Sequence, residues 1–103
     1  MVFNVIITEP ANDDLEEIVT YLSETLDNPS AADRLTERVD RVIDHLSIMP
    51  EMYDSLSVYE EQKKGLRKVP LGKYLMVFQI DEPSETVRIL RFFHGTQDYG
   101  AML

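Results

Sequence analysis

The stretch "LEEIVTYLSETLDNPSAADRLTERVDRVIDHLSIMP", residues 15–50, decides the fold because it predicts two helices joined by a short turn. Before the turn, apolar residues recur at the spacing of one helix face: Leu15, Ile18, Val19, Leu22 and Leu26. A second apolar stripe follows it: Leu35, Val39, Val42, Ile43, Leu46 and Met49. Because so few residues separate the two stripes, we expect an antiparallel helical hairpin.

Local signals mark the ends of both predicted helices. Thr8 can cap the first helix, and Pro10 is tolerated in its first turn. Asn28 is the expected N-cap of the second helix, with Pro29 at its first position. Pro50 ends the second helix after about Met49.

Strand patterns lie on both sides of the hairpin. Residues 2–8 have apolar side chains at both odd and even positions, and so on both faces of a strand, which predicts an internal strand. Three further strands are expected after the hairpin, separated by a turn at Gly72 and a loop over 81–85: residues 66–71, 73–80 and 86–94. Pro70 indicates an edge strand or a strand end.

The order β-α-α-β-β-β predicts an α+β domain in which the helical hairpin packs on a largely antiparallel sheet. With 103 residues, 44% hydrophobic and 28% charged, the chain is expected to form a single globular domain over residues 1–103. Residues 50–64 have no clear period, and we expect a long loop with a short strand near 57–59.

Composition excludes several classes of site and location. There is no cysteine, so neither a disulfide framework nor a thiolate metal site is possible. The start "MVFNVIITEP" is typical of a strand rather than a signal peptide, and no apolar run approaches the roughly 18 residues of a membrane span. We therefore expect a cytoplasmic protein that does not engage the membrane.

The net charge of −9 is unevenly distributed. Residues 1–62 carry 15 acidic and three basic residues, whereas residues 63–103 carry four acidic and seven basic ones. The three early bases, Arg34, Arg38 and Arg41, alternate with acids on the second helix, and we expect them to be solvated ion-pair partners. An acidic chain is a poor general nucleic-acid binder, although its basic C-terminal third can face an anionic partner.

The chain contains no motif for a cofactor, and we expect neither a cofactor nor a metal. His45 falls in the last turn of the second helix, where a histidine offsets the helix dipole. His94 and Asp98 are four residues apart, but no third metal ligand accompanies them.

The last strand carries cations among apolar residues. Alternation predicts one face made of Val87, Ile89, Arg91 and Phe93, and the other of Arg88, Leu90, Phe92 and His94. Arg67, Lys73 and His94 could converge at one rim, where cations hold phosphate and a histidine moves a proton in RNA cleavage. The alternative is structural: Arg88 and Arg91 pair with acids on neighbouring elements, while His94 and Asp98 pin the strand end.

Three segments together resemble the RelE/ParE superfamily of bacterial type II toxin–antitoxin toxins. The first is the hairpin 15–50 with its junction residues Asn28, Pro29, Ala31, Ala32 and Arg34; the others are "LRKVPLGKYLMVFQI" (66–80) and "ILRFFHGTQDY" (89–99). The resemblance implies the same β-α-α-β-β-β fold. It also implies a toxin neutralised by a cognate antitoxin whose C-terminal segment wraps it, with plasmid stabilisation as a role.

The superfamily holds two activities: ribosome-dependent mRNA cleavage and inhibition of DNA gyrase by protein–protein binding. Leu75 stands where the resemblance to the nucleases would place an arginine, and a second arginine would fall near Gly95 or Thr96. We therefore expect a ParE-like gyrase inhibitor rather than an enzyme.

Two alternatives stay open. One is a RelE-like ribosome-dependent endoribonuclease with Arg67, Lys73, Arg91 and His94 as catalytic residues. The other is a degenerate member that only binds antitoxin. The antitoxin is expected on the helical hairpin and the exposed sheet edge, and DNA contact would be indirect, through the antitoxin. If the acidic half of the chain faces it, the antitoxin segment should be basic or strongly apolar.

Overall fold

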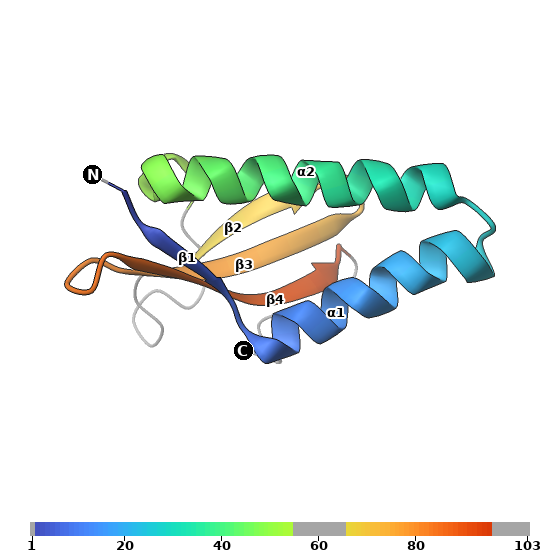
Figure 1. The fold of residues 1–103 in the computed structure, drawn as a ribbon, viewed down its shortest axis with the longest axis horizontal. Coiled ribbons are helices and arrows are strands. Elements are labelled where there is room, and N and C mark those ends of the chain that lie inside the picture. The colour runs from blue at the N-terminus through green and yellow to red at the C-terminus, as the bar shows by residue number, and fades with distance from the viewer. Residues whose placement is uncertain (1, 55–65, 96–103) are drawn as a thin grey trace.

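The computed structural model describes residues 2–54 and 66–95 (Figure 1). In chain order the elements are β1 (Asn4–Ile7), α1 (Glu9–Thr20), the π-helical turn η1 (Tyr21–Thr25), α2 (Pro29–Ile48), the 3₁₀ turn η2 (Pro50–Met52), β2 (Leu66–Leu71), β3 (Tyr74–Asp81) and β4 (Thr86–His94). The β-α-α-β-β-β order is therefore confirmed. Within 50–64 the structure describes η2 and the residues to 54, and the strand expected near 57–59 lies outside the described residues.

The four strands form one mixed sheet in the order β1-β4-β3-β2. β4 pairs antiparallel with β3, and β3 with β2, while β1 runs parallel to β4. The largely antiparallel sheet is thus confirmed, and Pro70 lies in the edge strand β2 as expected. The prediction of an internal strand at residues 2–8 is wrong, because β1 is the other edge and Ile6 and Ile7 remain 40% and 38% exposed. An apolar run shows hydrophobicity but not how many strands pair with it.

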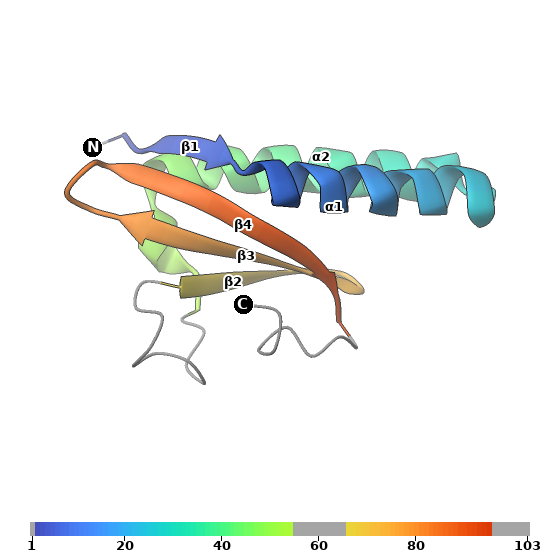
Figure 2. The same cartoon turned by 90° about the horizontal axis from the view of Figure 1, so that it is seen from below.

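Both helices cover the same face of the sheet, and the hairpin extends past the ends of the strands (Figures 1 and 2). α2 is the main cover, with five buried residues: Ala32, Leu35, Val39, Val42 and Leu46. In α1 only Ala11 is buried, and Leu15 and Ile18 of α1, with Leu22 of η1, pack against the core while partly exposed. A second, smaller cluster of Leu66, Val77 and Phe93 lies on the opposite face of the sheet, as strand alternation from Met76 and Phe78 requires.

The helix ends follow the local signals. The Thr8 hydroxyl accepts a hydrogen bond from the Ala11 amide at 3.4 Å, and the Asn28 side-chain oxygen accepts one from Ala31 at 3.1 Å. After α1 the helix widens into η1, where the Leu26 amide donates to the Tyr21 carbonyl at 2.9 Å. Asp27 then takes a left-handed φ of 49°, which turns the chain towards α2.

A β-bulge in β4 corrects the predicted faces of that strand. Val77 pairs with Arg91 and Phe78 with Ile89, so Leu90 has no partner across the ladder. The extra residue shifts the alternation by one position. Ile89 and Phe92 therefore both face the helices, and Arg88 and Arg91 share the opposite face. The prediction from strict alternation, which placed the two members of each pair on opposite faces of the strand, is therefore wrong.

No helix within residues 2–54 and 66–95 is both long and apolar enough to cross a bilayer.

Candidate functional site

The end of the sheet beneath the overhanging hairpin gathers the side chains of interest. There β4 ends beside the turn between β2 and β3, and the Gly95 amide donates to the Lys73 carbonyl at 2.7 Å. A Cβ at position 95 would lie 3.0 Å from that carbonyl oxygen. Any larger residue would push this contact apart, so the close approach explains glycine at a position where a nuclease-like arginine was considered.

Tyr74 and His94 face each other across this end of the sheet. They are paired in the ladder, and their rings meet edge to face with centroids 5.5 Å apart. Burial, and then the neighbouring Tyr21, raise the pKa of Tyr74 above its ordinary value of 10.0. Its hydroxyl therefore stays protonated at neutral pH and cannot act there as a base. With Asp14, Glu17 and Arg91, these rings line a cleft of about 400 Å³.

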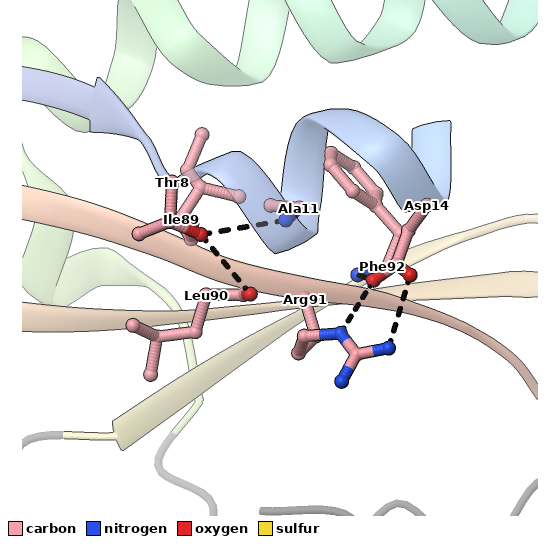
Figure 3. A network of polar contacts seen from close by, with 7 residues as sticks. All are labelled: Thr8, Ala11, Asp14, Ile89, Leu90, Arg91 and Phe92. Atoms are coloured by element: carbon pink, nitrogen blue, oxygen red, sulfur yellow. Dashed lines mark hydrogen bonds and ion pairs between the residues drawn. The ribbon is translucent and has the colours of Figure 1, made fainter. Parts of the chain in front are cut away.

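Beyond the point where β1 stops, residues at the start of α1 take over the hydrogen bonding along the edge of β4 (Figure 3). The last ladder pair is Ile7 with Ile89. Next along the chain, the Thr8 amide donates to the Ile89 carbonyl at 3.1 Å, and the Thr8 hydroxyl donates to the same oxygen at 2.8 Å. Six residues later, Asp14 accepts a hydrogen bond from the Phe92 amide at 3.0 Å. We call this set, Thr8, Asp14 and Arg91 with their backbone partners, the α1–β4 junction.

Arg91 is held by Asp14 within this junction. Its Nε donates to Asp14 Oδ2 at 2.7 Å and its Nη2 to Oδ1 at 3.0 Å, a two-pronged pair (Figure 3). The hydrogen bond that Arg91 donates to Asp14 is the main cause that raises the pKa of Arg91. The pair compensates the charge of Arg91, and a phosphate that approached its remaining N–H groups would meet the Asp14 carboxylate beside them. Arg88 likewise contacts Asp81 at 3.5 Å, so the structural interpretation of both arginines is confirmed.

Arg67 does not join the other predicted site residues. Its Nη1 donates to the Tyr53 carbonyl at 2.6 Å and to the Glu51 carbonyl at 3.4 Å, which ties η2 and the residue after it to β2. Arg67 pairs with Phe78, four residues along β3 from Tyr74, or about 13 Å at the rise of a strand. Of the four predicted residues, Lys73 and His94 line one groove, and Arg91 and His94 share the cleft.

The remaining candidate ligands do not assemble. His45 lies in the last turn of α2, as expected, with its Nδ1 3.3 Å from the Tyr53 hydroxyl. Asp98, the expected partner of His94, lies outside the described residues. Within those residues no three histidine or acidic side chains come together as a metal site would require.

A wider groove of about 840 Å³ runs between η1, α2 and the β2–β3 turn, and we call it the hairpin groove. Its cationic side chains are Arg34, Arg38, Arg41 and Lys73, with His94 at its end. The expectation that the α2 arginines form ion pairs is wrong for the part of the chain that the structure describes, where the two salt bridges are Arg88–Asp81 and Arg91–Asp14. Exposed pairs along a helix are weak, so nothing holds these long side chains against their own helix.

The sequence did contain a signal for this groove. Arg34, Arg38 and Arg41 each precede a buried residue of the apolar stripe by one position, so they run along one border of that stripe. Arginines on such a border lie beside the helix interface, with their stems on apolar surface and their charges outward.

Comparison with known proteins places this geometry in a family. The sequence model described as "ParE toxin of type II toxin-antitoxin system, parDE" matches residues 5–99. No curated protein matches the chain.

Several solved structures share the fold. The chromosomal ParDE system from P. aeruginosa aligns with a TM-score of 0.69 and 17% identity over 90% of this chain and 96% of that one. A mutant of the E. coli toxin RelE in the free state aligns at 0.68 with 14% identity over 99% and 93%. The toxin–antitoxin complex RelBE2 from Mycobacterium tuberculosis aligns at 0.62 with 23% identity over 91% and 99%. Together with the family match, these findings show that the chain belongs to the ParE toxin family within the RelE/ParE toxins of type II toxin–antitoxin systems.

Proposed function

We propose that this toxin inhibits DNA gyrase by protein–protein binding and is neutralised by a co-encoded antitoxin. The observation that carries the proposal is the state of Arg91. The one arginine that lines the cleft beside His94 is bound through two hydrogen bonds to Asp14, which compensates its charge and occupies one edge of its guanidinium. A ribosome-dependent nuclease needs free cations at that place to stabilise charge on the scissile phosphate.

Two further positions support a non-enzymatic toxin. Leu75, where a nuclease-like arginine was considered, packs against the apolar cluster on the face of the sheet away from the helices. A side chain at position 95 would place its Cβ 3.0 Å from the Lys73 carbonyl oxygen, so the carbonyl would have to shift by a few tenths of an ångström. Neither position therefore supplies a cation for RNA cleavage.

The proposal includes the partners and the place of action. The antitoxin would be a cognate protein encoded beside the toxin; the RelBE2 relative was solved as a toxin–antitoxin complex. Gyrase acts on DNA in the bacterial cytoplasm, so the toxin would act there. It would contact DNA only through the antitoxin, and plasmid stabilisation would follow where the module is plasmid-borne.

A supercoiling assay tests this proposal. Purified toxin is expected to inhibit supercoiling by gyrase, and toxin mixed beforehand with its antitoxin is expected not to. A chain that is toxic in cells but leaves gyrase activity unchanged would contradict the proposal. Harmless overexpression without antitoxin would instead favour a degenerate member that only binds antitoxin.

A ribosome-dependent endoribonuclease is the second candidate, because Lys73 and His94 do line one groove together. It predicts codon-positioned mRNA cuts in a translation reaction that His94→Ala abolishes. The matched control is His45→Ala, which removes a histidine at the far end of α2 that takes no part in the groove. Intact mRNA after translation with the wild-type chain would exclude this candidate.

A further inference from the structure

Strand β1 is an edge strand that lacks the usual protection against pairing with another chain. Soluble proteins commonly place charged residues, especially lysine, or proline on their exposed edges. The opposite edge strand, β2, follows this rule, because it contains Arg67, Lys68 and Pro70. β1 has the sequence NVII, with neither a charge nor a proline, and no described strand lies on its outer side (Figure 2). Its edge is therefore open to a further strand.

The hydrogen bonds of β1 show which of its backbone groups face this open edge. The amides of Asn4 and Thr8 donate to carbonyls of the neighbouring chain segment that leads into and forms β4, at 2.8 and 3.1 Å. Because the direction of the backbone groups alternates along a strand, the amides and carbonyls of Val5 and Ile7 point to the outer side. These two residues are therefore placed to pair with an added strand.

We propose that the β1 edge binds a second copy of this chain, with the two β1 strands antiparallel about a two-fold axis. Such a contact is self-complementary, because each copy presents the same surface to the other. It would join the two four-stranded sheets into one continuous sheet, with both helical hairpins on the same face. Dimerisation through β1 is independent of what the toxin inhibits.

One register of the two strands satisfies the outward backbone groups. If Ile6 lies opposite the second copy's Ile6, each Val5 lies opposite an Ile7, and each such pair exchanges both of its N–H···O bonds. A register centred on Val5 would need the Phe3 amide, which already donates to the Ser47 carbonyl at the end of α2 at 2.7 Å. The contact with α2 thus selects the register centred on Ile6.

The side chains also match in this register. Asn4 lies opposite the second copy's Thr8, so polar residues meet at the two ends of the pairing. Between them Ile6 and Ile7, which are 40% and 38% exposed in the single chain, meet apolar residues. Residues 2–8 contain no charged side chain, so the pairing brings no like charges opposite each other. A strand that matches itself in both hydrogen bonding and polarity favours a second copy over an unrelated partner.

The contact is small, and it works against the net charge of the chain. A strand pair of this length lies at the low end of the roughly 1,200–2,000 Å² that specific interfaces bury. Two copies of net charge −9 also repel each other. We therefore expect a dissociation constant of about 10–100 μM that decreases as salt screens the repulsion.

Cysteine cross-linking of the full chain, without antitoxin, tests the register, because the sequence contains no cysteine. Ile6→Cys would place two Cα atoms about 4.5 Å apart in a pair without hydrogen bonds, within the range of a disulfide. Asn4→Cys is the matched control on the same strand and face, where the two Cα atoms would lie roughly 14 Å apart. Under mild oxidation, Ile6→Cys should form linked dimers at least tenfold faster than Asn4→Cys.

Sedimentation velocity of the unlinked chain measures the association itself. The wild-type chain should shift from monomer towards dimer between about 5 and 500 μM, and at lower concentration in higher salt. Ile6→Lys places two ammonium groups opposite each other and should weaken the dimer at least tenfold, although it lowers the net negative charge. Leu26→Lys makes the same charge change at another exposed apolar residue, in the hairpin groove, and should stay within twofold of wild type.

Several outcomes would overturn the inference. These are a wild-type chain that stays monomeric at about 500 μM, equal cross-linking of Ile6→Cys and Asn4→Cys, and a larger loss for Leu26→Lys than for Ile6→Lys. Alkylation of the Ile6→Cys thiol adds a further outcome. A thiol that is shielded by the antitoxin but equally reactive at low and high toxin concentration would assign the edge to the antitoxin instead of a second copy.

Discussion

Arginines occur in two regions of this molecule in opposite states. At the α1–β4 junction, Arg91 is bound to Asp14 through two hydrogen bonds, and the same carboxylate accepts a hydrogen bond from the Phe92 amide. In the hairpin groove, Arg34, Arg38 and Arg41 form no ion pair with any residue the structure describes. Arg91 on the strand looks catalytic in the sequence but has a structural role. The α2 arginines look like solvated surface residues in the sequence, yet their guanidinium groups are available for binding.

The difference comes from what lies opposite each side chain. Arg91 faces a helix that takes over the edge of its strand, so an acid is already in place when the fold forms. The α2 arginines line the hairpin groove, where none of them forms an ion pair with a described residue. The two regions thus differ in whether the fold places an acid within ion-pair distance of the guanidinium.

The largest expected effect is at the junction. Asp14→Ala should lower the free energy of unfolding by about 2–3 kcal/mol, because it leaves a half-buried guanidinium and a backbone amide without their acceptor. Urea unfolding followed by circular dichroism measures it. Glu17→Ala on the same helix is the control and should change stability by less than about 0.5 kcal/mol. Equal losses for the two variants would show that Arg91 does not depend on Asp14.

The junction should also depend on its first residue. Thr8→Ala removes the N-cap of α1 and the hydrogen bond to the Ile89 carbonyl, with an expected loss of about 1 kcal/mol. Thr8→Ser should retain most of the stability. The cap of α2 offers a comparison, since the Asn28 side chain bonds to the Ala31 amide of its own turn. If Asn28→Ala costs more than Thr8→Ala, the link between α1 and β4 is weaker than the geometry indicates.

In the groove, the opposite result is expected. Arg34→Ala, Arg38→Ala and Arg41→Ala should each leave the free energy of unfolding within about 0.5 kcal/mol of wild type, because no ion pair is lost. Thermal and urea unfolding of the three single variants measure it. A loss above about 1 kcal/mol for any of them would assign that arginine a structural role and end the contrast with Arg91.

The smallest effect concerns the second strand pair, Arg88 with Asp81. Hydrogen bonding from Ser84, and then the nearby Arg88, hold the pKa of Asp81 below its ordinary value of 3.8. A carboxyl with a lowered folded pKa contributes stability above its unfolded pKa and loses it as the pH falls through the folded value. Asp81→Asn should therefore slightly reduce the loss of stability below pH 4, and Ser84→Ala should raise the pKa of Asp81 more than Arg88→Gln does. Carboxyl titration by NMR measures both shifts.

Much of this fold could be predicted from residues near one another in the chain. The two apolar stripes, the caps at Thr8 and Asn28 and the proline at position 70 predicted the hairpin, its limits and an edge strand. These features depend on helical periodicity, on hydrogen bonds within one turn and on the amide that proline lacks. Each is complete within a few residues, so tertiary contacts had little to add.

The candidate site depends on contacts that the sequence does not contain. Asp14 and Arg91 are 77 residues apart, and their pairing requires that β1 end where it does and that Leu90 bulge from the ladder. The bulge moves every later side chain of β4 to the other face, which no strict alternation predicts. Whether an arginine has an ion-pair partner depends on which acids come close to it when the helices pack on the sheet. The sequence by itself determined the elements and their order, and the tertiary structure decided which cations remain available, because compensation of a charge depends on distance in space.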